Sequence, residues 1–341
     1  MVNKMIKESK KDNRIELMRI IAMVLVIVLH VSNRYLLKMT DVNTVDNFFL
    51  VFINCITRVS VPLFFMISGI VNISKNYDRK KYFSRIFRMI VILIVWTLVY
   101  YFTGNYKPIN LLHSLFSFLR PHLWYMYALI GLCIATPFIS KMVKNLTKEE
   151  EKLFIILWII ISGFYYLFKV IVGLFGVNTD ITHPVPIFGA AYYLGYYIVG
   201  YIIYNNYEKI TKNKQSLLIF IAVLCVVINT MLTYVISIKN NTYYQGFFGY
   251  SNLLIMIPSL VVLILCLTGF KDKDYKIVKY VCPYAFGIYL SHVLVLDYFI
   301  KAIKFSNVFV GCICLSIISF VISYILIFII KKIPYINKYI C

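Results

Sequence analysis

The feature that most constrains this chain is a series of apolar runs, each close to 20 residues long, separated by short polar breaks. The hydrocarbon core of a bilayer is about 30 Å thick, and an α-helix of about 20 apolar residues crosses it. A soluble chain would distribute its apolar residues over shorter amphipathic elements. Because lipid offers the backbone no hydrogen-bond partners, such runs fold as helices. We therefore predict an all-α integral membrane protein with about ten transmembrane helices in one bundle.

The predicted spans cover most of the sequence. Composition supports them, since 61% hydrophobic residues, 14% charged residues and a mean hydropathy of +0.80 lie far outside the range of a soluble domain. A further apolar segment, 109–119 (INLLHSLFSFL), is too short to span, and we expect it to lie at the interface or to re-enter the bilayer. The spans are predicted at residues 15–37, 48–74, 89–103, 122–140, 153–174, 186–204, 216–238, 250–270, 277–300 and 308–330.

The distribution of basic residues predicts the orientation of the bundle. Most lysines and arginines of the short loops fall on the side of the membrane that holds both termini, and the more positive loops face the cytoplasm. We therefore predict a basic cytoplasmic tail at 1–14, a membrane domain at 15–330 and a second cytoplasmic tail at 331–341, in a multi-pass protein of the cell membrane. This pattern and the attraction of anionic headgroups explain the net charge of +21, so no nucleic-acid partner is expected.

The cysteines give no sign of a metal site. Eight of them are scattered along the chain, nearly all inside apolar runs and without metal-type spacing. We expect them to pack as small apolar residues, and we expect no bound metal. Because no long linker or internal repeat is visible, any chemistry has to take place in the bundle itself.

Two polar groups interrupt the first predicted span. Arg19 and His30 stand eleven residues apart in MRIIAMVLVIVLHV, which is three helical turns plus about 20°, so they share one face about 16 Å apart along the axis. Arg19 then lies at the inner interface, where it could be a snorkelling residue that only sets the topology. His30 lies near or beyond the middle of the bilayer, where a polar group is costly and by default functional, although a packing role stays open.

The next two spans add further cations. Arg58, in RVSVPLFFMISG, is predicted at a depth similar to that of His30, where it costs roughly 2.5–3.5 kcal/mol and needs an anionic or carbonyl partner. A structural ion pair is the alternative, with Asp297 as the obvious acidic candidate. At the inner end, Arg85 and Arg88 share a helix face in DRKKYFSRIFRM. They indicate either a headgroup patch or a site for the phosphates of a polyanionic cofactor.

Aromatic and imidazole side chains gather in the outer half of two later spans. His122, Trp124 and Tyr125 begin the fourth span in RPHLWYMY, and Tyr289 and His292 lie within FGIYLSHVLVLD in the ninth. An aromatic belt at the membrane interface would explain the tryptophan and the tyrosines. His292 is harder to explain in that way, because it lies deep in an apolar helix.

Taken in order, these stretches resemble the acyltransferase type 3 family of membrane-bound O-acyltransferases. The first span resembles the family's opening helix, in which an arginine and a histidine, here Arg19 and His30, are separated by ten residues, and Glu16 occupies an acidic position of that motif. Later segments resemble family segments in the same order, namely VPLFFMISG at 61–69, SRIFRMIVI at 84–92, HLWYMYALIG at 122–131 and FGIYLSHVLV at 286–295. The resemblance covers nearly the whole chain.

The resemblance implies about ten transmembrane helices and the transfer of a short acyl group to a carbohydrate hydroxyl. The implied donor is cytoplasmic acetyl-coenzyme A (acetyl-CoA) or another short acyl-CoA, with no metal. The implied acceptor is a cell-wall, capsular or lipid-linked glycan, and the resemblance does not choose among these. Longer family members carry an extracytoplasmic esterase-like domain that this sequence lacks, so a relay that ends on such a domain would need a separate protein.

The resemblance and the predicted depths together suggest roles for the polar residues. The phosphates of coenzyme A would bind at the inner face, and the pantetheine arm would run along the first helix to His30, a general base or nucleophile that titrates near neutral pH. Arg58 would stabilise the oxyanion or orient the acceptor. The full assignment is catalytic for His30, Arg58 and His292, cofactor-binding for Arg19, Arg85, Arg88 and Ser68, and acceptor-binding for His122, Trp124, Tyr125 and Tyr289.

Two other functions also use buried polar groups. A transporter or flippase of a lipid-linked saccharide would need them along its substrate path, but the usual signs of such proteins, an internal repeat and paired interrupted helices, are not visible. A scaffold or sensor without chemistry would not need a deep arginine, two deep histidines and a basic cluster together. We therefore expect a membrane O-acyltransferase.

Overall fold

A computed structural model of the chain describes residues 12–75, 77–104, 120–175, 186–210 and 212–334. The regular structure of these residues is helical, and no strand occurs among them, which confirms the all-α prediction. In chain order the elements are α1 (Asn13–Leu36), α2 (Val45–Thr57), α3 (Ser60–Ile73), α4 (Arg79–Thr103), η1 (Pro121–Leu123), α6 (Trp124–Lys144), α7 (Lys148–Trp158), η2 (Ile159–Phe164), α8 (Tyr165–Leu174), α9 (Pro186–Asn206), η3 (Tyr207–Lys209), α10 (Lys212–Asn240), η4 (Gly246–Phe248), α11 (Leu253–Gly269), α12 (Lys276–Val281), η5 (Cys282–Tyr284), α13 (Ala285–Ala302) and α14 (Val308–Lys332).

Nine helical stretches of the described chain are long and apolar enough to cross a membrane, and each coincides with one of the predicted spans. They are Asn13–Leu36, Val45–Ile73, Arg79–Thr103, Pro121–Lys144, Lys148–Leu174, Lys214–Asn240, Gly246–Gly269, Lys276–Ala302 and Val308–Lys332. The remaining predicted span, 186–204, coincides with α9, a helix of 21 residues whose first side chains lie outside the described set. The segment 109–119 also lies outside the described residues, so its predicted interfacial position stays a prediction.

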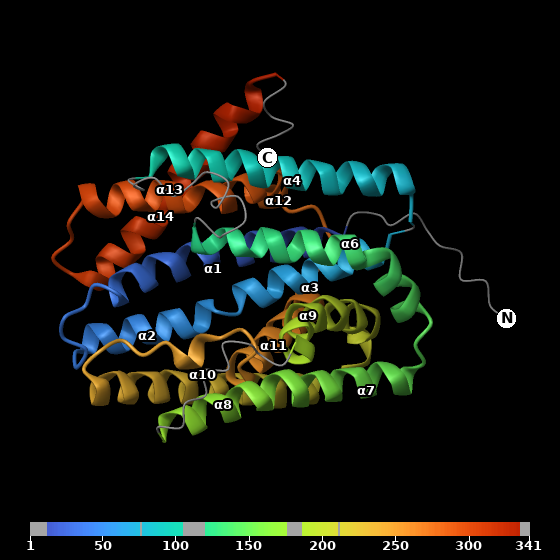
Figure 1. Ribbon diagram of the computed structural model, residues 1–341, viewed down its shortest axis with the longest axis horizontal. Coiled ribbons are helices and arrows are strands. Elements are labelled where there is room, and N and C mark those ends of the chain that lie inside the picture. The colour runs from blue at the N-terminus through green and yellow to red at the C-terminus, as the bar shows by residue number, and fades with distance from the viewer. Residues whose placement is uncertain (1–11, 76, 105–119, 176–185, 211, 335–341) are drawn as a thin grey trace.

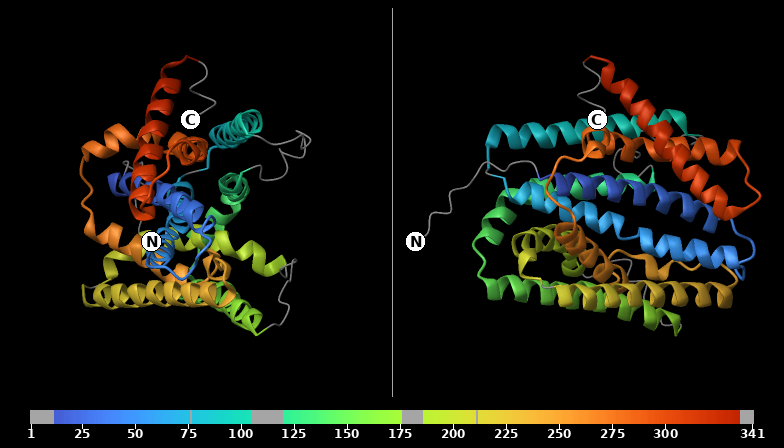
Figure 2. Two further views of the ribbon diagram at one scale, coloured as in Figure 1. Left: turned by 90° about the vertical axis from the view of Figure 1, so that its left-hand side faces the viewer. Right: turned by 180° about the vertical axis from the view of Figure 1, so that it is seen from behind.

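α1 lies at the centre of the bundle, against α2, α3, α13 and α14 (Figures 1 and 2). Its buried side chains form two sets at helical spacing. Met18, Ala22 and Val26 pack in one apolar cluster with residues of α3 and α6, whereas Met23 and Ile27 pack in another with residues of α2, α13 and α14. Because lipid is as apolar as these side chains, close packing rather than exclusion of water holds the helix in place. α1 is therefore fixed on two sides.

α3 and α9 approach each other closely at two glycines. A Cβ atom on Gly69 of α3 would lie 1.8 Å from the carbonyl oxygen of Tyr197, and one on Gly200 of α9 would lie 2.6 Å from the Cα atom of Met66. Small residues at such crossings allow backbones to pack together in a membrane, where van der Waals contact drives helix association. This contact fixes α3, which carries Ser68, against α9.

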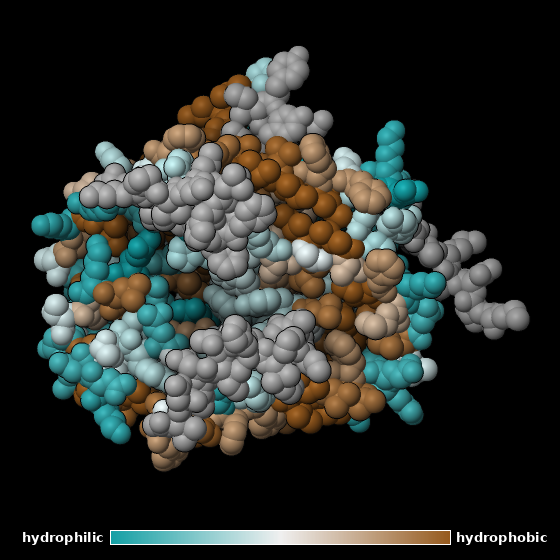
Figure 3. Space-filling model, viewed as in Figure 1, coloured by the Kyte–Doolittle hydropathy of each residue, from teal (hydrophilic) through white to brown (hydrophobic). Residues whose placement is uncertain are grey.

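The outer helices present apolar side chains away from the bundle. Leu217 and Phe220 of α10 and Ile313 and Ile317 of α14 are exposed in the isolated chain. On the face shown in Figure 3, hydrophilic residues gather towards the two ends, and apolar residues lie between them above, below and to the right of the centre. This surface suits a multi-pass membrane protein.

The two ends of the bundle are named by α1. The end at which α1 begins is called the basic end below, and the opposite end is called the far end. That the basic end faces the cytoplasm stays a prediction.

The second span is interrupted in its middle. Thr57 ends α2 and Ser60 begins α3, and the two residues between them, Arg58 and Val59, form a turn. Pro62 follows within the first turn of α3, where a missing backbone N–H costs little. The interruption places Arg58 at a helix end inside the bundle rather than along a continuous helix.

A polar network anchors the beginning of α1 at the basic end. The carboxylate of Asp12 caps the helix by accepting from the backbone N–H of Arg14, and it also accepts from the hydroxyl of Tyr204 on α9. Arg14 pairs with Asp12 at 2.8 Å and donates to the hydroxyl of Tyr207 and to the carbonyl of Leu267. Burial alone would raise the pKa of Asp12, but the hydrogen bonds and charge of Arg14 outweigh it and lower that pKa below 3.8.

Candidate active site

A cavity of about 260 Å³ opens between α1, α3, α6, η5 and α13, and we call it the donor cavity. It brings together four residues that the sequence assigned to two different substrates: Arg19 and Ser68, predicted to bind the cofactor, and Tyr125 and Tyr289, predicted to bind the acceptor. The Oγ atom of Ser68 lies 3.4 Å from the hydroxyl of Tyr125. The remaining lining residues are Phe64, Ile67, Leu129, Cys282, Ala285 and Phe286.

Arg19 is held in place at the edge of this cavity. Its Nη1 atom donates to Oε2 of Glu16 at 2.6 Å, the contact that a spacing of three residues on a helix allows. The same carboxylate accepts a hydrogen bond from the thiol of Cys282 on η5. About 30% of the Arg19 side chain stays exposed. The guanidinium also donates to the sulfur of Cys282 at 3.9 Å, so it is fixed at one end of its fork while part of it remains accessible to a ligand.

Further cations lie beside Arg19 at the basic end. Arg85 of α4 turns inward and donates to the side-chain oxygen of Asn72 on α3 at 2.7 Å, whereas Arg88, predicted to share its role, is exposed. Lys75, at the end of α3, was not among the predicted site residues. Partial burial, followed by the positive charges of Arg85 and Arg19, lowers the pKa of Lys75. Arg85 and Arg19 are thus within electrostatic range of Lys75, which is the kind of grouping that a polyanion site uses.

Three imidazoles meet near the middle of the bundle, although they come from three separate elements. The ring centroid of His30 on α1 lies 5.2 Å from that of His292 on α13 and 6.1 Å from that of His122 on η1, and the last two lie 5.5 Å apart. His122 and His292 are buried, while His30 is partly accessible. The sequence assigned His30 and His292 to catalysis and His122 to the acceptor. The structure places all three in one cluster, called the histidine cluster below.

The tautomer of His292 follows from its surroundings. Its Nδ1 atom lies 2.6 Å from the carbonyl oxygen of Tyr289. Because a carbonyl can only accept, Nδ1 carries the proton and Nε2 is left with a lone pair. That Nε2 atom is buried and has no hydrogen-bond partner in the described structure. A buried acceptor without a partner is costly, and it is suited to receive a proton or a substrate hydroxyl.

Tyr289 separates the donor cavity from the histidine cluster. Its side chain lines the cavity, and its ring lies 6.0 Å from that of His122 and 5.9 Å from that of His292. Its hydroxyl donates to the backbone carbonyl of His122 at 2.5 Å. A ligand that fills the cavity from the basic end therefore ends one side chain away from the imidazoles.

Arg58 is connected to the helix turn that holds His30. Its Nε atom donates to the side-chain oxygen of Asn54 at 3.0 Å, and the amide of Asn54 donates in turn to Ser32 of α1 at 2.9 Å. The guanidinium also lies over the ring of Phe248 at 4.6 Å. Asn54 is fully buried, and the sequence gave no signal for it because an isolated asparagine in an apolar run has no characteristic spacing.

The possible ion pair between Arg58 and Asp297 is wrong. Asp297 pairs instead with Arg34 at 2.7 Å and with Arg120 at 2.9 Å. Sequence depth alone suggested the pairing, but the carboxylate of Asp297 is occupied by the other two arginines. Arg58 is partly buried and contacts a side-chain amide and aromatic faces rather than a carboxylate.

Trp124 belongs to an aromatic group. Its ring lies 4.9 Å from that of Tyr193 and 5.9 Å from that of Tyr250, and Phe65 completes the group. The indole is half-buried, so only part of it is accessible to a sugar ring. Its predicted contact with the acceptor stays a prediction.

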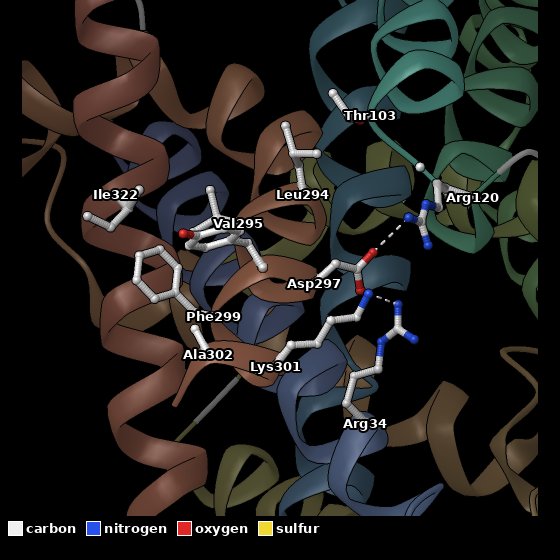
Figure 4. Close-up of a pocket in the computed structure, with 12 residues that line it drawn as sticks. Arg34, Thr103, Arg120, Leu294, Val295, Asp297, Phe299, Lys301, Ala302 and Ile322 are labelled. Atoms are coloured by element: carbon white, nitrogen blue, oxygen red, sulfur yellow. Dashed lines mark hydrogen bonds and ion pairs between the residues drawn. The ribbon is translucent and has the colours of Figure 1, made fainter. Parts of the chain in front are cut away.

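A second and larger cavity of about 900 Å³ lies at the far end, and we call it the far cavity. Figure 4 shows the carboxylate of Asp297 between Arg120 and Arg34. The sequence missed this arrangement, because Arg34 and Arg120 resemble ordinary loop charges when they are read one at a time. No group of three or more His, Cys, Asp or Glu residues in the described chain is arranged to hold a metal ion.

The apolar outer surface, the polar residues enclosed by helices and the two cavities on either side of an imidazole cluster define a multi-pass membrane protein with a candidate site inside its bundle. The model of the family described as the acyltransferase domain matches residues 12–330. The chain therefore belongs to that family and is a membrane acyltransferase. Comparisons with curated proteins and with solved structures gave no match.

Proposed function

We propose that this protein transfers a short acyl group, acetyl in the first instance, from cytoplasmic acyl-CoA to a hydroxyl of a cell-surface or lipid-linked carbohydrate. The observation that carries the proposal is the position of the histidine cluster between the donor cavity at the basic end and the far cavity at the other end. Such an arrangement lets a donor and an acceptor approach from opposite sides of a membrane and react in the interior. The protein then resides in the cell membrane.

The donor half of the proposal rests on charge and length. Arg19, Arg85 and Lys75 gather at the basic end, where the phosphates of coenzyme A would bind through charge-assisted hydrogen bonds. The donor cavity combines apolar side chains with the hydroxyls of Ser68, Tyr125 and Tyr289, and this mixture suits the methylenes and amides of the pantetheine arm. His30 lies eleven residues along α1 from Arg19, a rise of about 16 Å, so an extended arm that begins at Arg19 carries its thioester towards the cluster. Tyr289 lies across that path, and its displacement by the donor is part of the proposal.

The chemistry requires one base and one stabiliser of negative charge. His30 takes the proton of the acceptor hydroxyl while the hydroxyl oxygen forms a bond to the thioester carbon. The carbon–sulfur bond then breaks, and the coenzyme A thiolate leaves and receives the proton. Hydrogen bonds through Asn54 and Ser32 connect Arg58 to α1 two residues after His30, and in the proposed reaction Arg58 balances the charge that develops on the carbonyl oxygen. The lone pair on Nε2 of His292 is available to accept from a neighbouring hydroxyl of the saccharide and so to orient the acceptor.

The test is a comparison of surface glycans. Glycans from cells that lack the protein, carry the wild-type protein or carry the His30→Ala variant are compared by mass spectrometry. Only with the wild-type protein do we expect the glycan mass to increase by one acyl group, which is about 42 Da for acetyl. If wild-type and deficient cells yield identical glycans, the assignment to a surface carbohydrate is wrong. In nanodiscs, the absence of any acetyl-CoA binding removes the donor half independently.

A further inference from the structure

The far cavity is not used by the donor half of the mechanism and shares no lining residue with the donor cavity. Its volume of about 900 Å³ falls at the upper end of the range for ligand sites. It is formed by α1, by the end of α4, by the residue that precedes η1, and by α13 and α14. Its described lining residues are Arg34, Thr103, Gly104, Arg120, Leu294, Val295, Asp297, Tyr298, Phe299, Lys301, Ala302 and Ile322.

The lining carries an excess of positive charge. Arg34, Arg120 and Lys301 face one acidic side chain, Asp297, among the described lining residues, which gives a net charge of +2. Asp297 bridges the two arginines, and side-chain exposures of 34% for Arg34 and 15% for Arg120 show that the first remains open to the cavity. A purely structural ion pair needs one cation for one carboxylate. The excess of cations is instead the arrangement that binds an anion.

The geometry of the two guanidiniums suits an oxyanion. Each guanidinium presents N–H donors in a planar fork that matches a carboxylate or a phosphate. The shared carboxylate of Asp297 holds both forks beside one another, so their positions are set before a ligand arrives (Figure 4). Lys301, one turn further along α13 and exposed, adds a mobile charge at the rim.

The far cavity is one side chain away from the histidine cluster. The guanidinium of Arg120 lies over the ring of Tyr100 at 5.6 Å, and that ring lies 5.1 Å from the ring of His122. Arg34 follows His30 by four residues on α1 and therefore shares its face. A ligand held by the arginines would place its neighbouring groups at the cluster.

We infer that the far cavity binds the acceptor, and that the acceptor is an anionic saccharide whose phosphate or carboxylate is held by Arg34, Arg120 and Lys301. The inference rests on the proposed function, because it names the substrate class of the same reaction. The inference also says how the saccharide lies in the site. Its anionic group binds among the arginines, and a hydroxyl elsewhere on the saccharide reaches the histidines.

Matched sugars test the inference. Purified protein in nanodiscs of zwitterionic lipid is titrated with glucose, glucose 1-phosphate and glucuronic acid, so that the phosphate and the carboxylate are separate arms. We expect at least one charged sugar to bind about tenfold more tightly than glucose, because hydrogen bonds to an ionised group are the stronger ones. Higher salt should reduce this preference. Acetyl-CoA is titrated in parallel as the donor control.

Variants locate the effect. Arg34→Gln should abolish the preference for the charged sugar and leave the acetyl-CoA affinity unchanged. Lys301→Gln, at an exposed position where misfolding is not expected, should reduce the preference about two- to threefold. The matched control is Lys304→Gln, which is also exposed and close in sequence but does not line the cavity, and which should have no effect.

Several outcomes would overturn the inference. Equal affinity for glucose and both charged sugars does so, as does a preference that survives in both Arg34→Gln and Lys301→Gln. Failure of every sugar to bind, together with an increase of the melting temperature in phosphatidylglycerol nanodiscs that is lost in Arg34→Gln, assigns the cavity to lipid headgroups. The proposed function fails separately, through the loss of acetyl-CoA binding, so the two failures are distinguishable.

Discussion

His292 and His30 differ in a way that decides how each can act. A backbone carbonyl fixes the proton of His292 on Nδ1, and its other nitrogen is buried without a partner. His30 is partly accessible and no backbone contact of this kind fixes its ring in the described structure. In the proposed reaction the first is therefore the fixed acceptor, and the second is the base whose ring can still reorient. Both depths follow from the sequence, but the tautomer does not, since it depends on one carbonyl of the preceding turn.

If His30 is the base, as proposed, we expect His30→Ala to lower acyl transfer by about 10²–10⁴-fold, the usual contribution of a general base. An alanine removes a costly polar group from an apolar helix, so the protein level should not fall. Transfer of labelled acetyl from acetyl-CoA is measured in membranes with matched amounts of protein. Near wild-type transfer would reduce His30 to a packing residue.

At the basic end, we expect Arg85→Gln to weaken acetyl-CoA binding about tenfold, because it removes an inward-facing cation held beside α3. Arg88→Gln is the matched control on the same helix. Arg88 is exposed, so its effect should be smaller. Calorimetric titration in nanodiscs gives both affinities. If the Arg88 variant lost as much acetyl-CoA affinity or more, the phosphate site would have to be assigned to the headgroup side of α4 instead.

At the scale of helices, the length of the apolar runs predicted the spans, because length and hydropathy are local properties of the chain. Local properties do not predict interruptions of a span. The turn at Arg58 and Val59 contacts Phe248 of η4 and is connected to α1 through Asn54. The aromatic group around Trp124 includes Tyr193 of α9 and Tyr250, which follows η4. Likewise, Asp297 pairs with Arg34 of α1 and with Arg120, the residue before η1. Such features come from neighbours that are distant in sequence.

The anchor of α1 provides a prediction about stability. Asp12→Asn keeps an N-cap but loses the ion pair with Arg14, and we expect a loss of about 1 kcal/mol in the free energy of unfolding. Because the folded pKa of Asp12 is lowered, its contribution is complete above the ordinary carboxyl value of 3.8 and is lost as the pH falls through the lowered folded value. Chemical unfolding in detergent at several pH values measures the difference. A difference that grew as the pH fell would contradict this linkage.

At the scale of the whole molecule, the two cavities can serve a donor and an acceptor from opposite sides of the membrane only if the two ends of the bundle face different compartments. The basic end carries the donor cavity and the far end carries the paired arginines. The sequence predicted two-sided access from its loop charges, but it did not predict the far cavity, which forms only when α1, α13 and α14 pack together.

Cysteine labelling tests the orientation in a protein whose native cysteines have been replaced by serine. A cysteine at exposed Thr242, near the far end, should react with an impermeant thiol reagent in intact cells, whereas one at exposed Lys148 should react only after permeabilisation. Thr242 is preferable to Asn241, whose backbone φ of 48° is unfavourable for a cysteine. Labelling at Lys148 in intact cells would reverse the assignment of the two ends.

A single helix, α1, carries Arg19 at the donor cavity, His30 in the histidine cluster and Arg34 at the far cavity. The helix fixes the distances and the angles between these three side chains. Exchanging one of them changes one position, but inserting or deleting a residue between Arg19 and His30 rotates one relative to the other by about 100°. The helix should therefore accept many substitutions along its apolar length and almost no change in the number of residues between Arg19, His30 and Arg34.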